Sequence, residues 1–122
     1  MDITPLIPSN KKIITGYGGG VFKINNEPFA GDIIIFPTNV IKWPVNSGIL
    51  TLESLSSALE NTDIEILIIG CGKEHMMLPA DIKRNFLAKN INIDIMTTGA
   101  ACRTYNVLLG EDRHVAAALM AV

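Results

Sequence analysis

The chain has 122 residues, near the common size of one domain, and 48% of them are hydrophobic, so it can form a core without a disulfide or a structural metal. Its formal net charge is −2 and its Lys and Arg residues never occur in runs longer than two, which disfavours nucleic-acid binding. No segment approaches the roughly 20 apolar residues of a membrane span. We therefore expect a single domain over residues 1–122.

The N-terminal part of the chain predicts antiparallel strands. Residues 1–12 contain two prolines and are expected to form an extended lead-in. Two short apolar runs flank Gly18-Gly19-Gly20, and glycines reach the positive φ angles of tight turns, so the pattern predicts a β-hairpin. Asn25-Asn26 turns the chain again. The expected strands cover residues 13–17, 21–24, 31–36 and 40–45.

The pattern changes at Thr51, which with Glu53 in the first turn is typical of a helix start. Residues 64–69 are nearly continuously apolar, as in a strand that is buried on both faces of a parallel sheet. From Gly99 onward the pattern predicts helix, in two pieces separated near Gly110, with Asp112 capping the second piece. The expected elements are a helix from residue 51, a strand over 64–69, a helix over 80–89, a strand over 91–96 and helix from 99.

The segments 64–69, 80–89 and 91–96 form a βαβ unit, whose two strands are expected to be parallel. Together with the earlier antiparallel strands, they predict a three-layer α/β fold with a central mixed β-sheet, an N-terminal β-hairpin and helices packed on the sheet. Residues 115–122 are small and apolar. They must pack either on the chain's own sheet or on another subunit, so the sequence is compatible with a homo-oligomer.

Ligands of open parallel sheets bind outside the carboxyl ends of the strands. Here those ends carry residues 70–73 and 97–103, which the βαβ unit should bring to one edge. Free N–H groups at the start of the predicted helix would favour an anion, and Arg103 could add donors. The alternative is that the glycines only turn the chain and Thr98 is an ordinary N-cap. The candidate ligand-binding residues are Gly70, Cys71, Gly72, Lys73, Thr98, Gly99, Cys102 and Arg103.

The sequence contains no complete catalytic set. His75 follows Cys71 by four residues, so a Cys–His pair is conceivable, but free cysteines at strand ends are usually small core residues. A redox pair of Cys71 with Cys102 would need Cα atoms within about 7 Å. The sequence shows neither the spacing of a zinc site nor a phosphate-binding motif followed by a helix. We expect no catalytic residue, no metal and no cofactor, and therefore a binding function.

Trp43 is the candidate partner-binding residue, because tryptophan is enriched at binding hot spots. It could equally cover one end of the core. The N-terminal residues lack the pattern of a secretory signal, and two cysteines are fewer than a disulfide-stabilised secreted domain usually carries. We therefore expect a cytoplasmic location.

An ordered set of motifs between residues 13 and 119 resembles a known family. The family is a group of small domains from bacteria and archaea, long labelled a domain of unknown function. It includes the mitochondrial NADH dehydrogenase (complex I) assembly factor 3 and an adipogenesis-associated human protein. The motifs are Ile14-Thr15-Gly16-Tyr17-Gly18, the neighbourhood of Trp43, Gly70-Cys71-Gly72, residues 98–108, Glu111-Asp112-Arg113 and residues 115–119.

The resemblance implies a compact three-layer α/β fold with a central mixed sheet, and it brings no reaction, cofactor or catalytic residue. The mitochondrial relative works with protein partners while a respiratory complex is assembled. Our first hypothesis is therefore a non-enzymatic protein-binding module that assists assembly of respiratory NADH dehydrogenase, with its subunits or assembly factors as partners. A shared fold does not transfer function. The alternative is a small-molecule or anion-binding protein, or an enzyme, that uses the 70–73 and 97–103 loops.

Overall fold

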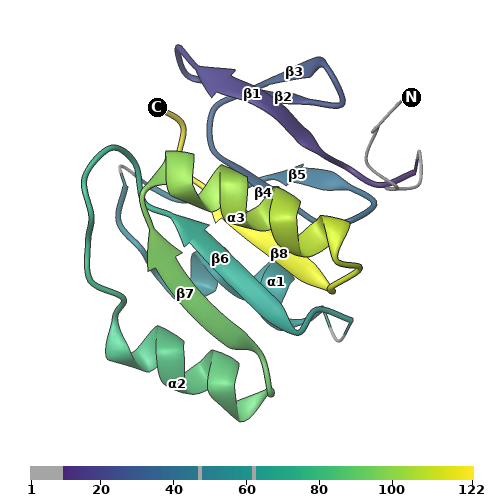
Figure 1. Cartoon of the computed structure of the whole chain (residues 1–122). Helices are drawn as coiled ribbons and strands as arrows, with labels where there is room; N and C mark the ends of the chain where they lie inside the picture. The colour runs from purple at the N-terminus through teal and green to yellow at the C-terminus, as the bar shows by residue number, and fades with distance from the viewer. Residues whose placement is uncertain (1–9, 47, 62) are drawn as a thin grey trace.

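The structure is a computed structural model that describes residues 10–46, 48–61 and 63–122. The predicted lead-in lies outside the described residues except for residues 10–12. Five strands come first, and helices and strands alternate after them (Figure 1). In chain order the elements are β1 (Ile14–Gly18), β2 (Val21–Ile24), β3 (Glu27–Ala30), β4 (Ile33–Ile35), β5 (Val40–Lys42), the 3-10 helix η1 (Glu53–Leu55), α1 (Ser56–Leu59), β6 (Ile66–Gly70), α2 (Ala80–Ala88), β7 (Asn92–Met96), α3 (Thr98–Gly110) and β8 (Val115–Leu119).

The strands form two sheets. The five-stranded sheet has the order β5-β4-β8-β6-β7, in which β6 is parallel to both β7 and β8, while β4 is antiparallel to β5 and β8. The predicted mixed sheet and the parallel strands of the βαβ unit are therefore confirmed. The second sheet is antiparallel, with the order β1-β2-β3. It contains the predicted hairpin and one strand, β3, that the sequence interpretation missed.

The turn that adds β3 is built from two asparagines. Asn25 and Asn26 have φ angles of 50° and 68°, and they connect the paired residues Ile24 and Glu27. A two-residue hairpin turn with positive φ at both central positions favours asparagine and glycine, because these residues tolerate the left-handed region. The Asn25-Asn26 turn was predicted correctly, but the short strand that follows it, Glu27–Ala30, is mostly exposed and has no apolar alternation to reveal it.

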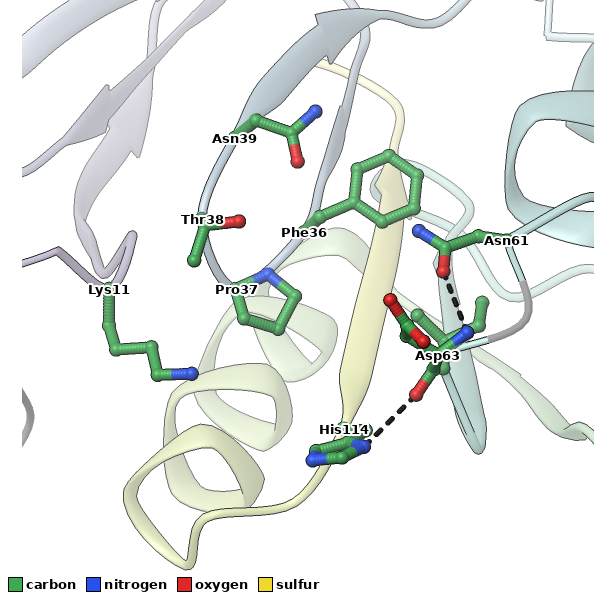
Figure 2. A pocket seen from close by; sticks show the side chains of 9 residues that line it. Lys11, Phe36, Pro37, Thr38, Asn39, Asn61, Asp63 and His114 are labelled. Atoms are coloured by element: carbon green, nitrogen blue, oxygen red, sulfur yellow. Dashed lines mark hydrogen bonds between the residues drawn. The ribbon is translucent and has the colours of Figure 1, made fainter.

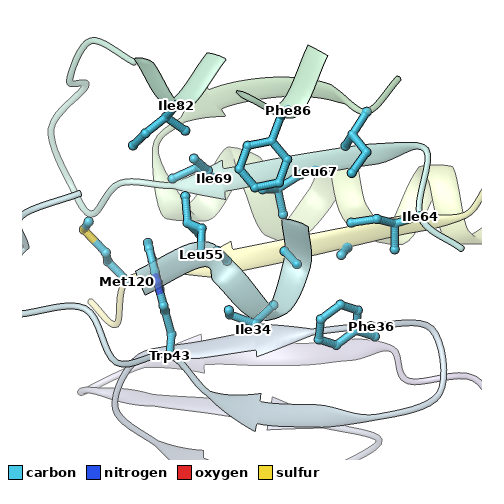
Figure 3. Close-up of a cluster of buried hydrophobic side chains, with 14 residues drawn as sticks. Ile34, Phe36, Trp43, Leu55, Ile64, Leu67, Ile69, Ile82, Phe86 and Met120 are labelled. Atoms are coloured by element: carbon cyan, nitrogen blue, oxygen red, sulfur yellow. The ribbon is translucent and has the colours of Figure 1, made fainter. Parts of the chain in front are cut away.

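Side chains alternate between the two faces of the five-stranded sheet, and each face carries its own core. On one face, Ile34, Leu67 and Ile69 pack under η1, α1 and α2, as Figure 3 shows. On the other face, Ile33, Ile35 and Ile68 pack under α3 and against β1 and β2. This alternation has the period of two that a strand requires. It produces the predicted layered arrangement, with helices on both sides of the sheet.

The predicted second helical piece near the C-terminus is wrong. Asp112 has a φ of 60° in the turn after α3, and β8 (Val115–Leu119) then lies in the interior of the sheet with all five residues buried. It pairs with β4 on one edge and β6 on the other. Alanine is the best intrinsic helix former, but burial on both faces and two partner strands outweigh that local preference. The C-terminal run therefore packs within the chain's own sheet.

Candidate functional site

The two predicted loops meet at the carboxyl ends of β6 and β7. The N–H of Thr98 donates to the carbonyl of Gly72 at 2.9 Å, and the N–H of Gly72 donates to Thr98 Oγ1 at 2.8 Å. The parallel register of β6 and β7, which aligns Gly70 with Met96, brings the two loops to the same edge. The predicted adjacency is confirmed. We call residues 70–73 and 97–103, together with Tyr17 beside Gly99, the rim.

Thr98 holds the rim to the end of the central strand. Its side chain is fully buried, and Oγ1 also donates to the carbonyl of Met120 at 2.7 Å. The N-cap of α3 is Thr97, which makes no side-chain capping bond. The interpretation of Thr98 as an ordinary N-cap is therefore wrong: its hydroxyl connects the ends of β6, α3 and β8.

Two positions of the rim require glycine. A Cβ atom on Gly70 would lie 2.9 Å from Leu119 Cδ2 and 3.0 Å from the Cα of Thr98, so only glycine lets α3 start this close to β6. Gly72 has a φ of 98°, a region that other residues rarely adopt, and the space around it is open. Packing explains Gly70 and turn geometry explains Gly72.

Tyr17, at the end of β1, is the rim residue that sequence reasoning missed. A Cβ on Gly99 would lie 2.6 Å from the Tyr17 hydroxyl and 3.7 Å from Nη1 of Arg103, so the tyrosine and the arginine flank the first turn of α3. The Tyr17 side chain is 44% exposed. An exposed aromatic residue inside the glycine-rich segment was the available signal, but nothing local connects that segment to α3.

Asn106 fixes β1 against α3 and so positions Tyr17. Asn106 Oδ1 accepts from the N–H of Ile14 at 3.0 Å, and its Nδ2 donates to the carbonyl of Ile14 at 2.8 Å. One residue earlier in α3, the hydroxyl of buried Tyr105 donates to the carbonyl of Lys12 at 3.0 Å. These bonds attach the start of the three-stranded sheet to the middle of α3.

A hollow of about 420 Å³ lies over the rim. It includes three of the predicted site residues, Gly72, Lys73 and Gly99. Gly70, Cys71, Thr98 and Cys102 are buried, while Arg103 is exposed next to Gly99. The hollow is lined by Tyr17, Gly18, Gly19, Gly72, Lys73, Thr97, Gly99 and Val122.

Both cysteines are buried and free. Cys71 Sγ donates to the carbonyl of Glu74 at 3.3 Å, so its partner is the main chain. Burial raises the pKa of the Cys102 thiol to about 11, although the charge of Arg103 acts in the opposite direction. Cys102 therefore stays protonated at neutral pH, and a protonated thiol is a poor nucleophile. The interpretation of these cysteines as small core residues fits the structure.

Trp43 is not an exposed anchor. Its side chain is 3% exposed, and Nε1 donates to Ser54 Oγ at 3.2 Å. The indole packs in the same cluster as Leu55 and Met120 (Figure 3). Of the two interpretations that the sequence left open, the one that places Trp43 in the core is correct, because the side chain is buried and Ser54 in η1 satisfies the indole N–H.

The rim offers groups for binding. Around the hollow are a phenol, an ammonium group and exposed glycine backbone, with a guanidinium beside it. In the part of the chain that the structure describes, no three His, Cys, Asp or Glu side chains gather closely enough to hold a metal ion. None of the described helices has the length and apolar character needed to cross a membrane.

Solved structures share this fold over almost the whole chain. An outer membrane protein from Bartonella henselae is 41% identical, with a TM-score of 0.86, and the match covers 95% of this chain and 98% of that one. A protein from Bordetella parapertussis is 32% identical with a TM-score of 0.85, and the match covers 94% of this chain and all of that one. These similarities confirm the α/β fold.

Curated relatives and a family model extend the comparison. The NADH dehydrogenase [ubiquinone] 1 alpha subcomplex assembly factor 3 of Drosophila melanogaster is 39% identical over 114 residues, which is 88% of this chain but 58% of that protein's length. An uncharacterized protein of Rhodobacter capsulatus is 31% identical over 107 residues, covering 88% of this chain and 82% of its own. Residues 14–120 match the model of a protein family of unknown function (DUF498/DUF598), and the chain belongs to this family.

Proposed function

We propose that this chain is a non-enzymatic protein-binding module that assists the assembly of a respiratory NADH dehydrogenase. The observation that carries the proposal is the 39% identity to a protein named as an assembly factor of that enzyme, over 88% of this chain. The family region, residues 14–120, includes both Tyr17 and the rim. Binding a protein partner requires exposed side chains that can anchor it.

The partner-binding surface in this proposal is the outer face of the rim, defined by Tyr17, Lys73, Gly99 and Arg103. Tyrosine and arginine are enriched among residues that dominate binding energy, because they combine apolar contact with hydrogen bonding. Tyr17 is half-exposed over Gly99, and Arg103 is exposed beside it. A side chain of a partner that enters the hollow next to Tyr17 would reach both.

The test is affinity purification of the tagged full chain from its native cells, with mass spectrometry of NADH dehydrogenase subunits and assembly intermediates. We expect these subunits to be enriched, and Tyr17→Ala and Arg103→Ala each to reduce the enrichment about tenfold or more. Arg84→Ala, an exposed arginine on α2, is the matched control and should behave like the wild type. Absence of every NADH dehydrogenase subunit from the wild-type sample would contradict the proposal.

A second candidate function is the binding of a small anion in the same hollow. The observation that favours it is the position of Lys73 in the hollow together with Gly99 at the start of α3, where unpaired N–H groups attract negative charge. Thermal-shift measurements with inorganic phosphate and with nucleotides would test it. The expected result is stabilisation that Lys73→Ala removes. Unchanged melting temperatures with all of these anions would eliminate this candidate.

A further inference from the structure

A second hollow, of about 240 Å³, lies at the end of the sheet opposite the rim (Figure 2). It is bordered by residues 36–39, which connect β4 to β5, by residues 61 and 63–64 before β6, and by His114 before β8. Lys11, which precedes β1, also lines it and extends its side chain toward it. We call this hollow the polar cleft.

One wall of the polar cleft is held by main-chain hydrogen bonds. His114 Nδ1 lies 3.0 Å from the carbonyl oxygen of Asp63. A carbonyl can only accept, so Nδ1 carries the proton of this bond, and in the tautomer with its proton on Nδ1 the other ring nitrogen, Nε2, is an acceptor. The carbonyl of His114 in turn accepts from the N–H of Glu65 at 2.8 Å, which fixes the residue at the start of β8.

The neighbouring asparagine and aspartate are also oriented. Asn61 Oδ1 accepts from the N–H of Asp63 at 2.9 Å, which leaves the amide NH₂ of Asn61 as a donor. Within the described residues, the carboxylate of Asp63 has no hydrogen-bond or ion-pair partner, so its acceptor capacity is unused. Figure 2 shows this carboxylate on the side of the cleft across from Lys11.

The opposite wall carries the positive charge. The N–H of Lys12 donates to the carbonyl of Pro37 at 2.7 Å, and the carbonyl of Lys11 accepts from Asn25 Nδ2 at 3.1 Å, so the backbone at Lys11 is held at the cleft. Among the described residues, the ammonium group of Lys11 has no ion-pair partner. Between the two charged walls, buried Phe36 and Ile64 contribute apolar surface.

We propose that the polar cleft binds a small zwitterion of the α-amino-acid type. The carboxylate of the ligand pairs with Lys11, its ammonium group pairs with Asp63 and His114 Nε2, and its side chain contacts Phe36. A simple anion would be repelled by Asp63 and a simple cation by Lys11, whereas a zwitterion matches both walls. The volume lies below the roughly 300–1,000 Å³ of drug-sized sites, which fits a ligand of this size. This proposal is independent of the rim and of its protein partner.

Titration of the ¹⁵N-labelled full chain with L-alanine, L-serine and L-leucine tests the proposal. At least one should shift amide resonances at 36–39, 61–64 and 114, with a dissociation constant of about 1 mM, as the small contact area implies. Acetate and methylammonium, which carry one charge each, should bind about tenfold more weakly. The proposal is overturned if none of the amino acids shifts these resonances at about 20 mM. It is equally overturned if acetate binds as tightly as the best amino acid.

Variants separate this site from general charge attraction. Lys11→Met and Asp63→Asn should each weaken amino-acid binding about tenfold, because each removes one charged partner. Lys12→Met is the matched control: it removes the adjacent lysine, which is not among the residues lining the cleft, and should change binding by less than about twofold. Equal losses for Lys11→Met and Lys12→Met would show that net charge holds the ligand and would overturn the proposal.

Discussion

The two ends of the five-stranded sheet use their polar residues in opposite ways. At the rim, the Thr98 hydroxyl is buried and makes its hydrogen bonds to the chain itself, and Gly70 leaves no room for a side chain. At the polar cleft, the charged groups of Lys11 and Asp63 have no ion-pair partner among the described residues. The buried hydroxyl at the rim therefore holds the fold together, whereas the two charged groups that face each other at the polar cleft stay available.

The difference shows which residues can report on binding. A substitution inside the rim changes stability, so a loss of binding there is ambiguous. Its outer side chains, those of Tyr17, Lys73 and Arg103, can be changed without opening the core. The charged side chains at the polar cleft, those of the half-buried Lys11 and the exposed Asp63, can be replaced with little effect on the free energy of unfolding.

The largest expected effect is that of Gly70→Ala. The added methyl would lie 2.9 Å from Leu119 Cδ2 and 3.0 Å from the Thr98 Cα, so we expect a loss of about 2–4 kcal/mol in the free energy of unfolding. Gly16→Ala is the control, because its added carbon would meet Lys23 at an ordinary 3.8 Å, and it should cost less than about 1 kcal/mol. Urea denaturation measures both. Equal losses would contradict the close contact of α3 with β6.

Thr98→Val comes next. Valine keeps the shape but leaves the Gly72 N–H and the Met120 carbonyl without their partner, and each is a buried or partly buried group. We expect a loss of about 2–3 kcal/mol by the same denaturation measurement. Thr38→Val at the polar cleft should stay within about 0.5 kcal/mol of the wild type, because Thr38 is exposed. If Thr98→Val and Thr38→Val lower the free energy of unfolding equally, the hydroxyl at the rim is no more important to the fold than the one at the polar cleft, and the contrast between the two ends of the sheet is wrong.

The pH dependence of stability gives a smaller effect at the rim. Burial raises the pKa of Cys102 to about 11, so the thiol ionises in the unfolded chain before it does in the folded one. Keeping this thiol protonated therefore contributes to the free energy of unfolding at neutral pH. That contribution, about 1–2 kcal/mol, is lost as the pH rises toward 11. Burial also raises the pKa of Tyr105, which acts in the same direction at higher pH. In urea denaturation at increasing pH, the free energy of unfolding of Cys102→Ala should fall less steeply above about pH 9 than that of the wild type. An equally steep fall would show that Cys102 is not the group that causes it.

Gly99→Ala should have the smallest effect on stability. The new methyl displaces the hydroxyl of Tyr17, but that side chain is half-exposed and can rotate away, so the loss should be below about 1 kcal/mol. Partner binding should nevertheless fall, because the anchor is moved. Denaturation and affinity purification of the same variant separate the two readouts. A large loss of stability would show that Tyr17 belongs to the inner packing of the rim.

The sequence predicts the elements whose signals are local. The apolar run before Gly70 and the helical spacing after Pro79 were enough to predict the βαβ unit and the placement of the 70–73 and 97–103 loops at one edge of the sheet. The hairpin followed from its glycines.

The sequence could not predict features that depend on distant contacts. An alanine-rich run such as 115–119 favours helix in isolation, and only its two partner strands make it β8. Tyr17 meets Gly99 because Asn106 bonds the backbone of Ile14, a contact that no periodic pattern encodes. The polar cleft likewise combines four separate segments of the chain.

Site-specific photo-crosslinking in native cells tests the central claim most directly. A photoreactive phenylalanine analogue replaces Tyr17 in one experiment and Leu87, on α2, in the other; these side chains are similarly exposed, at 44% and 47%. We expect irradiation to yield a discrete adduct with a NADH dehydrogenase subunit or assembly intermediate from position 17 and none from position 87. Adducts of equal yield from both positions, or no such subunit crosslinked to position 17, would contradict the assignment of the rim as the partner-binding surface.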